Sequence, residues 1–323
     1  MPLSRRGAPV GPEAGSEDTG GGEPGDADRV SSLRTLTAPD GATIAYRLWQ
    51  PDRPRRLLVL LHGVASNMTR WSELVARTTL RDSWDLLRLD LRGQGASLHR
   101  GRIGMAEWCA DLAGILDAEG YPRAVVAGHC LGANIALEFG TRHPGRASGL
   151  ILIEPMLPPA MAGSMRTLAR IRPLLAPAVW LVRALNALGI HRRRLAPLDL
   201  EELDRRTRAA IAAAGASDRL LETYASPWLD LRTTATGAYL QALRAVTHQL
   251  PDLASIGVPA LALLSAGSTF SDPALTRRLL STMARCTIVT LDARHWIPTE
   301  QPDAMRRTIE QWCHGLEAIA PPT

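Results

Sequence analysis

The sequence predicts an α/β fold with a mostly parallel sheet covered by helices on both faces. Six short apolar segments follow one another along the chain, and stretches with helical spacing separate most of them. Apolar strands that alternate with helices are typical of a sheet buried on both sides. The chain has 323 residues and 46% hydrophobic content, enough for one large core, and sheets of this size usually form a single domain.

Each of the six strand candidates ends in a short turn that carries small or polar residues. In chain order they are RLLVLL (56–61) before HGV, WDLLRL (84–89) before DLRGQGAS, RAVVA (123–127) before GHCLG, GLILI (149–153) before EP, VPALALL (258–264) before SAG, and TIVTL (287–291) before DARHW. This order of strands, turns and helical segments predicts parallel strands joined by helices.

The turn at Gly128-His129-Cys130-Leu131-Gly132 lies between an apolar run and the helix-like segment 133–142. Strand, sharp turn and helix are the setting of the nucleophile elbow G-x-S-x-G, in which small residues let the backbone turn tightly and expose the middle side chain. Here that residue is Cys130. A thiolate forms far more easily at neutral pH than an alkoxide, and acyl transfer to it gives a thioester. Read alone, the cysteine also fits ordinary core packing.

At this point the chain resembles the α/β-hydrolase superfamily, from about Leu33 to Leu316. The resemblance depends on ordered motifs: the opening TAPDGATIAYR at 37–47, the His-Gly turn, the loop DLRGQGAS, the elbow, and a histidine after the last strand. It implies a catalytic order of nucleophile, acid and histidine. Two departures stand out, because cysteine replaces the usual serine and Gln94 stands where a histidine is common.

The resemblance also assigns roles around Cys130. His295, in ARH where the family commonly has AGH, is the expected base that accepts the thiol proton. The backbone N–H groups of Val64 and Leu131 are the expected oxyanion hole. His62 is expected to be structural in the His-Gly turn and His129 to pack.

The acid has two candidates. In most of the family an aspartate follows the penultimate strand as G-x-x-D, but Phe270 occupies that position here. Asp272 lies two residues later, whereas Glu154 ends the strand that follows the elbow, a place from which some relatives supply the acid. We take Glu154 as the acid and Asp272 as the alternative.

Strand and helix alternation stops between residues 156 and 249, where arginine, leucine and alanine dominate. In the resembled family a helical cap is inserted here, so we expect a lid within a single domain of residues 33–323. Its expected helices are 165–171, 178–188, 200–214 and 239–248. Side chains that could line its pocket are Met156, Met161, Met165, Trp180, Tyr224, Trp228 and Tyr239. Residues 1–32 are expected to form a disordered tail, because Gly, Pro, Glu and Asp dominate them.

Composition excludes several functions. The chain contains no lysine, so all 37 basic residues are arginine and a lysine-bound pyridoxal cofactor is excluded. A net charge of +5 with scattered arginines and 32 acids favours a solvated surface over nucleic-acid binding. No apolar run has the length of a membrane span, so no membrane partner is expected. The cysteines show no paired spacing, which favours free thiols in the cytoplasm without metal, disulfide or cofactor.

A thioester acyl-enzyme remains reactive toward amines, alcohols and carbon nucleophiles. The sequence therefore favours a thioesterase, acyltransferase or cyclase that acts on a natural-product or polyketide-like substrate, delivered as a thioester on CoA or a carrier protein. Two alternatives remain open: a cofactor-free lyase or carbon–carbon bond-forming enzyme acting on an electrophilic, quinone-like substrate, and a non-catalytic ligand-binding homologue.

Overall fold

A single eight-stranded sheet runs through the part of the chain that the computed structural model describes, residues 31–319 without 53, 215–223 and 268. The strand order is β1-β2-β4-β3-β5-β6-β7-β8, and β3 to β8 are parallel. The bounds are β1 Ser32–Thr37, β2 Thr43–Trp49, β3 Arg56–Leu61, β4 Trp84–Leu89, β5 Ala124–His129, β6 Ala147–Ile153, β7 Ala260–Ser265 and β8 Cys286–Leu291. The predicted fold class is confirmed, and the six predicted strands correspond to β3 to β8.

The sequence analysis did not predict two of the strands, β1 and β2. β1 pairs with β2, and β2 with β4, in antiparallel register at one edge of the sheet. β1 is largely exposed, with the sequence SLRTLT, so it lacks the apolar run by which the other strands were recognised. An edge strand of this kind buries one face at most and needs no continuous apolar sequence. It begins at Ser32, inside the predicted tail, whose residues 1–30 lie outside the described residues.

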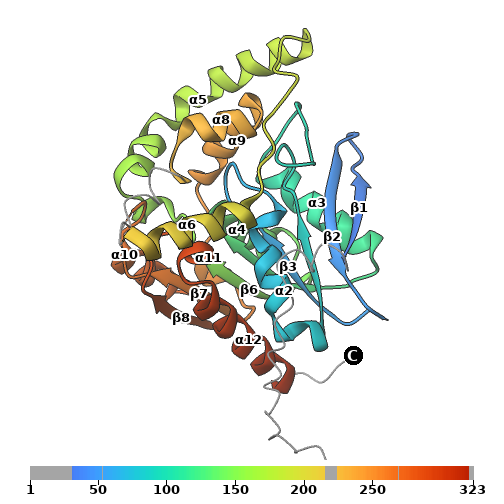
Figure 1. The fold of residues 1–323 in the computed structure, drawn as a ribbon, viewed down its shortest axis with the longest axis vertical. Helices are drawn as coiled ribbons and strands as arrows, with labels where there is room; N and C mark the ends of the chain where they lie inside the picture. The colour runs from blue at the N-terminus through green and yellow to red at the C-terminus, as the bar shows by residue number, and fades with distance from the viewer. Residues whose placement is uncertain (1–30, 53, 215–223, 268, 320–323) are drawn as a thin grey trace, which may run out of the picture.

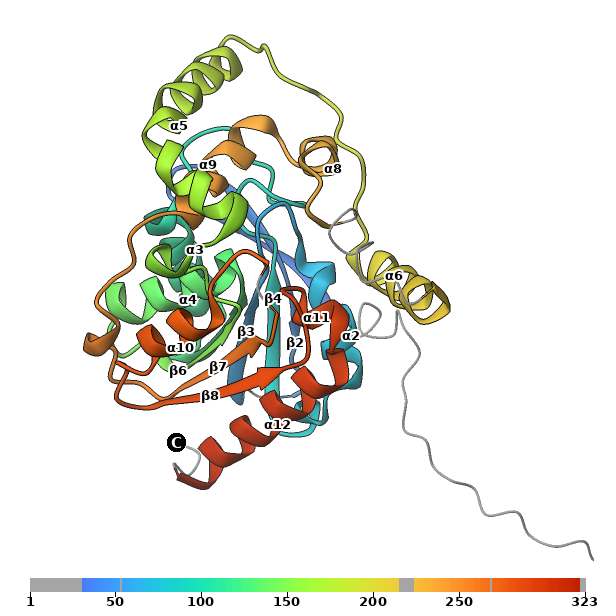
Figure 2. The same cartoon turned by 90° about the vertical axis from the view of Figure 1, so that its left-hand side faces the viewer.

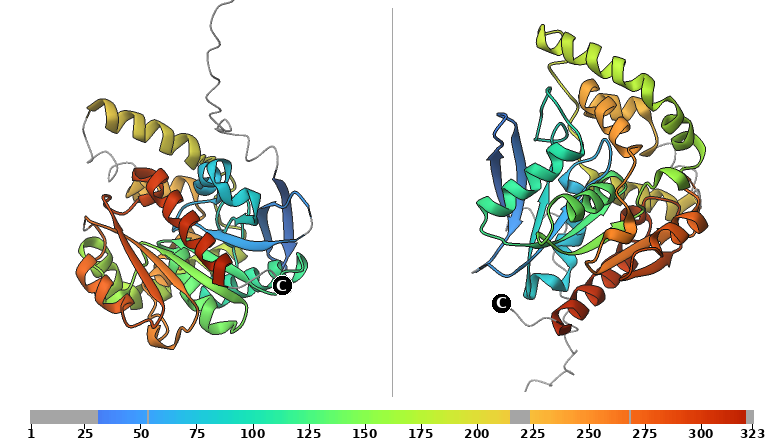
Figure 3. Two further views of the ribbon diagram at one scale, coloured as in Figure 1. Left: turned by 90° about the horizontal axis from the view of Figure 1, so that it is seen from below. Right: turned by 180° about the vertical axis from the view of Figure 1, so that it is seen from behind.

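Helices cover both faces of the sheet, and each layer has its own core (Figure 3). Leucines and alanines along α3 and α4 pack on one face, where the larger cluster lies. On the other face, α2 and α12 enclose the second cluster around Trp71, Leu80 and Ile309. The bounds are α2 Ser72–Arg77, α3 Met105–Ala118, α4 Leu131–Arg142, α10 Pro273–Leu280, α11 Ile297–Glu300 and α12 Pro302–Ile319, with short 3-10 turns η1 Met68–Trp71, η2 Thr79–Asp82, η3 Pro158–Ala160 and η4 Leu253–Ser255.

Among the described residues, four α-helices between β6 and β7 lie over one end of the sheet and are called the cap below (Figure 1). They are α5 Gly163–Ala187, α6 Leu200–Ala214, α8 Pro227–Thr233 and α9 Thr236–Val246. The first is one helix of 25 residues that contains Pro173 and Pro177, where the sequence indicated two shorter helices. The prolines interrupt the sequence pattern but not the helix, and α5 packs against α9. α8 was not predicted.

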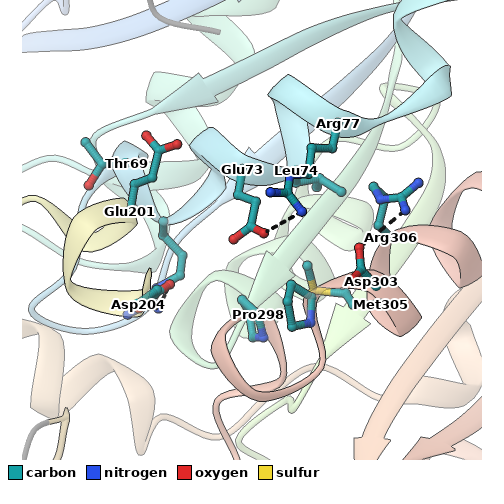
Figure 4. Close-up of a pocket in the computed structure, with 12 residues that line it drawn as sticks. Thr69, Glu73, Leu74, Arg77, Glu201, Asp204, Pro298, Asp303, Met305 and Arg306 are labelled. Carbon is teal, nitrogen blue, oxygen red and sulfur yellow. Dashed lines mark hydrogen bonds and ion pairs between the residues drawn. The ribbon is translucent and has the colours of Figure 1, made fainter. Parts of the chain in front are cut away.

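Charged contacts attach α6 to the body of the protein. Arg70 in η1 donates to both carboxylate oxygens of Asp204 at 2.6 Å and to the Thr299 hydroxyl at 2.7 Å. Arg208 of α6 pairs with Glu73 of α2 at 2.5 Å. Figure 4 shows side chains that line a small cavity near these contacts, Asp204 and Glu73 among them. The cavity has a volume of about 10 Å³. These contacts fix one side of the cap.

Candidate active site

The elbow at Cys130 is enforced by two glycines. A Cβ atom on Gly128 would lie 2.1 Å from the Gly132 backbone, and one on Gly132 would lie 2.3 Å from the Leu61 carbonyl oxygen. Only glycine fits either position, so β5 can turn directly into α4. Cys130 itself has φ 54°, a left-handed conformation that a non-glycine residue adopts at a cost. The strained turn presents the thiol to the space above the sheet.

The thiol, an imidazole and a carboxylate meet at this point. His295 hydrogen-bonds the Cys130 side chain, and its Nδ1 lies 3.2 Å from Glu154 Oε2. The other oxygen of Glu154 accepts the Ser265 N–H at 2.5 Å. Glu154 and His295 are both buried. The carboxylate therefore holds the imidazole with Nδ1 toward itself and Nε2 toward the sulfur.

The surroundings of His295 favour its charged form. Burial alone would lower the pKa of the imidazole, but its hydrogen bonds to Cys130 and Glu154 outweigh burial and raise that pKa to about 10. The imidazole therefore holds a proton readily at neutral pH. Phe270, at the position where the family's aspartate is usual, lies edge-on to this ring at 4.9 Å between centroids.

Asp272 is placed elsewhere. Its carboxylate caps the N-terminus of α10 and accepts the N–H groups of Ala274 at 2.9 Å and Leu275 at 3.0 Å. N-terminal capping is the commonest structural use of an aspartate that precedes a proline-led helix. Of the two acids considered from the sequence, only Glu154 contacts His295.

Two backbone N–H groups border the thiol. Leu131 is the first residue of α4, so its N–H has no acceptor within the helix. Val64 lines the same cavity as Cys130 and follows Gly63, whose added Cβ would lie 3.4 Å from the Cys130 Cβ. The His-Gly turn thus lies directly against the elbow, which is the arrangement an oxyanion hole requires.

Two polar side chains, His62 and Gln94, shape this turn. His62 Nε2 accepts the Leu91 N–H at 3.0 Å, and its Nδ1–H donates to the Gly63 carbonyl at 2.9 Å. Burial lowers the pKa of His62 to about 4, so it stays neutral in this structural role. Gln94 Oε1 accepts the Ser66 N–H at 3.1 Å. The sequence showed Gln94 only as a departure; in the structure it supports the loop after Val64.

His129 connects the elbow to the loop of the catalytic histidine. Its Nε2–H donates to the His295 carbonyl oxygen at 3.0 Å, and burial lowers its pKa. The sequence indicated packing alone for this residue. Its hydrogen bond gives it a further use, because it fixes the backbone of His295 relative to Cys130.

A cavity of about 570 Å³ opens above the thiol, between the sheet and the cap. Its walls are mostly apolar, with Met156, Met165, Leu168, Leu243 and Val246 among them. Such a cavity suits an acyl chain or another apolar ligand of moderate size. Within the described part of the chain, no three His, Cys, Asp or Glu side chains are grouped as metal ligands.

Four of the cap side chains singled out in the sequence line this cavity: Met156, Met165, Tyr224 and Tyr239. Met161 is buried in the core, and Trp180 and Trp228 lie on the surface, 71% and 80% exposed. The sequence left open which of these side chains line the pocket, because composition cannot show which side of a cap helix faces inward. The sequence also missed Asp230, the one carboxylate among the described lining residues. Tyr239 hydrogen-bonds it, and burial raises its pKa to about 6.

We expect Cys130 to be the first thiol alkylated near neutral pH. Cys109 and Cys313 are buried, and burial raises the pKa of Cys109 to about 12 and that of the half-buried Cys286 to about 11. Only Cys130 has an imidazole beside it. Brief iodoacetamide treatment followed by peptide mass mapping measures this selectivity. Equal labelling of Cys286 would contradict an activated Cys130.

Comparison with protein families and solved structures places the chain among hydrolases. Residues 52–302 match the family model Hydrolase_4, described as serine aminopeptidase, S33. The monoacylglycerol lipase of Mycolicibacterium smegmatis is 34% identical over 137 residues, 39% of this chain and 48% of that protein. Epoxide hydrolase B of Mycobacterium tuberculosis is 32% identical over 108 residues, 32% of this chain and 30% of that protein. The chain thus spans less than half the length of these curated relatives.

Similar solved structures support the fold alone, since sequence identity to them is low. A hydrolase from Pseudomonas aeruginosa has a TM-score of 0.62 at 22% identity and covers 87% of this chain and 98% of its own. The enol-lactonase of Burkholderia xenovorans has a TM-score of 0.62 at 20% identity, with 87% of this chain and 100% of its own covered.

Proposed function

Because the chain belongs to the Hydrolase_4 (serine aminopeptidase, S33) family of the α/β-hydrolase superfamily, we propose that it is a cofactor-independent acyl-transfer enzyme with a cysteine nucleophile. Cys130 is the nucleophile, His295 the acid–base group and Glu154 the residue that orients the imidazole. The observation that carries this proposal is the contact of His295 with both Cys130 and Glu154 at the elbow. The two curated relatives described above, a monoacylglycerol lipase and an epoxide hydrolase, are hydrolases, which supports chemistry at an acyl or related carbon.

In the first half-reaction, His295 takes the proton of the Cys130 thiol, and the thiolate attacks the carbonyl carbon of the acyl donor. A carbon–sulfur bond forms, and the carbonyl oxygen becomes an oxyanion that the N–H groups of Leu131 and Val64 stabilise, each by roughly 3 kcal/mol. The intermediate then collapses. The bond to the leaving group breaks, the leaving group takes the Nε2 proton of His295, and an acyl thioester remains on Cys130.

In the second half-reaction the acceptor gives its proton to His295 and attacks the thioester carbon. A second oxyanion forms in the same hole, the carbon–sulfur bond breaks, and the thiolate is restored beside the imidazolium. Water as acceptor makes the enzyme a thioesterase, whereas an amine or alcohol makes it an acyltransferase or, within one substrate, a cyclase. A thioester intermediate suits all three because it is close in free energy to a thioester donor.

The cavity supports an acyl group of small or medium size as substrate. Its lining is mostly apolar and includes both Cys130 and the carboxylate of Asp230 on α8. A natural-product or polyketide-like acyl chain with a polar substituent would match such a lining. Delivery as a thioester of CoA or of a carrier protein fits the proposed chemistry.

Trapping of the acyl-enzyme tests the proposal. We expect hexanoyl-N-acetylcysteamine to add one hexanoyl group to the protein within the first turnover, detected by intact mass after an acid quench. Peptide mapping should place the group on Cys130, and Cys130→Ala should remain unmodified. Neither a lyase nor a binding protein would leave this adduct. Turnover of the thioester without a mass increase on Cys130, or an adduct on Cys286 in its place, would contradict the proposal.

A further inference from the structure

Large apolar side chains are exposed along the outside of the cap. Figure 2 shows α5 at the far end of the molecule from α12, with one side directed away from the rest of the cap. Leu174 is 69% exposed and Leu188 75%. The exposed large apolar residues of the cap, here called the outer cap surface, are Ile171, Leu174, Trp180, Leu181, Leu188, Ile190 and Trp228. Only Leu33 and Leu98 are comparably exposed elsewhere in the described residues.

The exposed residues of α5 form a stripe. Leu174 and Leu181 of α5 and Leu188 at its C-terminal cap are seven residues apart, a spacing that keeps them on one side of a helix. Pro177 and Trp180, between the first two, are exposed as well. A soluble protein gains nothing from a continuous row of this kind in water, and large exposed apolar patches usually mark a contact surface.

The same segment carries only positive charge. Residues 155–198 contain seven arginines and no aspartate or glutamate. The arginines are Arg166, Arg170, Arg172, Arg183, Arg192, Arg193 and Arg194. In the described ranges none of them forms an ion pair with a carboxylate. Seven positive charges exceed the net charge of +5 of the whole chain, so the rest of the protein has a slight excess of acids.

We propose that the outer cap surface docks on an anionic lipid surface. Leucine and tryptophan side chains would enter the region between headgroups and acyl chains while the arginines contact the anionic headgroups, which is how amphipathic helices lie in a membrane interface. A second copy of this chain does not fit the surface, because it would bring seven arginines against seven. An acidic protein partner would account for the seven arginines but not for the exposed row of leucines.

Surface docking differs from a membrane span. In the described part of the chain no helix is long and apolar enough to cross a bilayer, and the expectation of no membrane partner depended on that criterion alone. The outer cap surface is also connected to the cavity, since Ile171 belongs to both, and α8 exposes Trp228 while Leu229 and Asp230 line the cavity. A docked enzyme would have its cap, and the cavity beneath it, next to the lipid. The docking argument does not depend on the proposed acyl-transfer function.

Vesicle sedimentation tests the proposal without any assay of activity. We expect the full chain to sediment with vesicles of phosphatidylcholine and phosphatidylglycerol, and much less with phosphatidylcholine alone. The triple variant Leu174→Ser/Leu181→Ser/Leu188→Ser should lower the partition coefficient at least about tenfold. Arg170→Gln/Arg183→Gln should lower binding to anionic vesicles about tenfold at low salt and change binding to neutral vesicles little.

Matched controls lie far from the cap. Leu33→Ser removes an exposed leucine from β1, and Arg278→Gln an exposed arginine from α10; both should bind vesicles like the parent. Circular dichroism verifies that each variant is folded. Equal affinity for neutral and anionic vesicles, or no affinity for either, would overturn the proposal. So would a dimer in light scattering that the triple variant abolishes, or a complex with an acidic acyl carrier protein in the absence of vesicle binding.

Discussion

Replacing Cys130 by alanine is expected to lower kcat for a thioester substrate by about 10⁵ or more. Loss of a nucleophile removes the covalent route entirely, and what remains comes from binding and from the oxyanion donors. The fold should persist, because Cys130 lies on the surface of the cavity and alanine keeps the Cβ that the turn already accommodates. Steady-state kinetics with hexanoyl-N-acetylcysteamine measure the loss of kcat, and a thermal melt shows whether the variant is folded.

Cys130→Ser is the informative partner of this variant. The elbow presents a hydroxyl where it presented a thiol, so weak hydrolysis of activated oxygen esters should remain, while acyl transfer from thioesters falls sharply. A serine hydroxyl is far less acidic than a thiol, so the pKa of His295 should fall toward its ordinary value, because the hydrogen bond to Cys130 is the largest contribution that raises it. Retention of parental thioester turnover by Cys130→Ala would assign the chemistry to another residue.

Glu154→Gln is expected to lower kcat by up to about 10⁴ while the protein remains folded, with KM little changed. The Gln amide N–H can donate to Nδ1, which favours the imidazole tautomer with Nε2 protonated, and a protonated Nε2 cannot accept the thiol proton. Glu154 also raises the pKa of His295. Its removal should therefore lower that pKa, and the imidazolium should be lost at lower pH than in the parent, which histidine NMR can follow.

Asp272→Asn is the matched control for this variant. Asparagine caps helices about as well as aspartate, so both stability and turnover should stay close to those of the parent. Glu154→Asp should recover little activity, because the shorter side chain cannot hold both the Ser265 N–H and the imidazole. Loss of turnover in Asp272→Asn with activity retained in Glu154→Gln would reverse the roles given to the two acids.

Sequence reasoning identified the sheet because its central strands are buried on both faces and are therefore continuously apolar. The elbow could be predicted because its two glycines are required. A Cβ atom at position 128 or 132 would lie 2.1 or 2.3 Å from backbone atoms, so no other residue fits. Glu154 became a candidate because Phe270 occupies the usual position of the acid. Each of these features is local, so the residue types carry the information.

Features of the cap were less readable because they depend on what lies opposite. Trp180 and Tyr239 are both aromatic residues on cap helices, yet one faces solvent and the other the cavity. Asp230 gave no signal, since an aspartate early in a helix is ordinarily a surface residue that favours the helix dipole. It lines the cavity because α8 folds over that cavity, and it is half-buried there.

The register between β5 and β6 determines which part of the site is lost first on heating. His129, the last residue of β5, pairs with Ile153, the last residue of β6. Cys130 and Glu154 directly follow these two residues, and the Cys130 N–H donates to the Ile153 carbonyl at 2.9 Å. Neighbouring strands lie about 4.8 Å apart, and these two belong to the most buried part of the sheet. The pairing of β5 with β6 thus fixes the positions of the Cys130 thiol and the Glu154 carboxylate, whereas His295 lies on a loop. Heat inactivation should accordingly begin as a local excursion of that loop, with the sheet still intact.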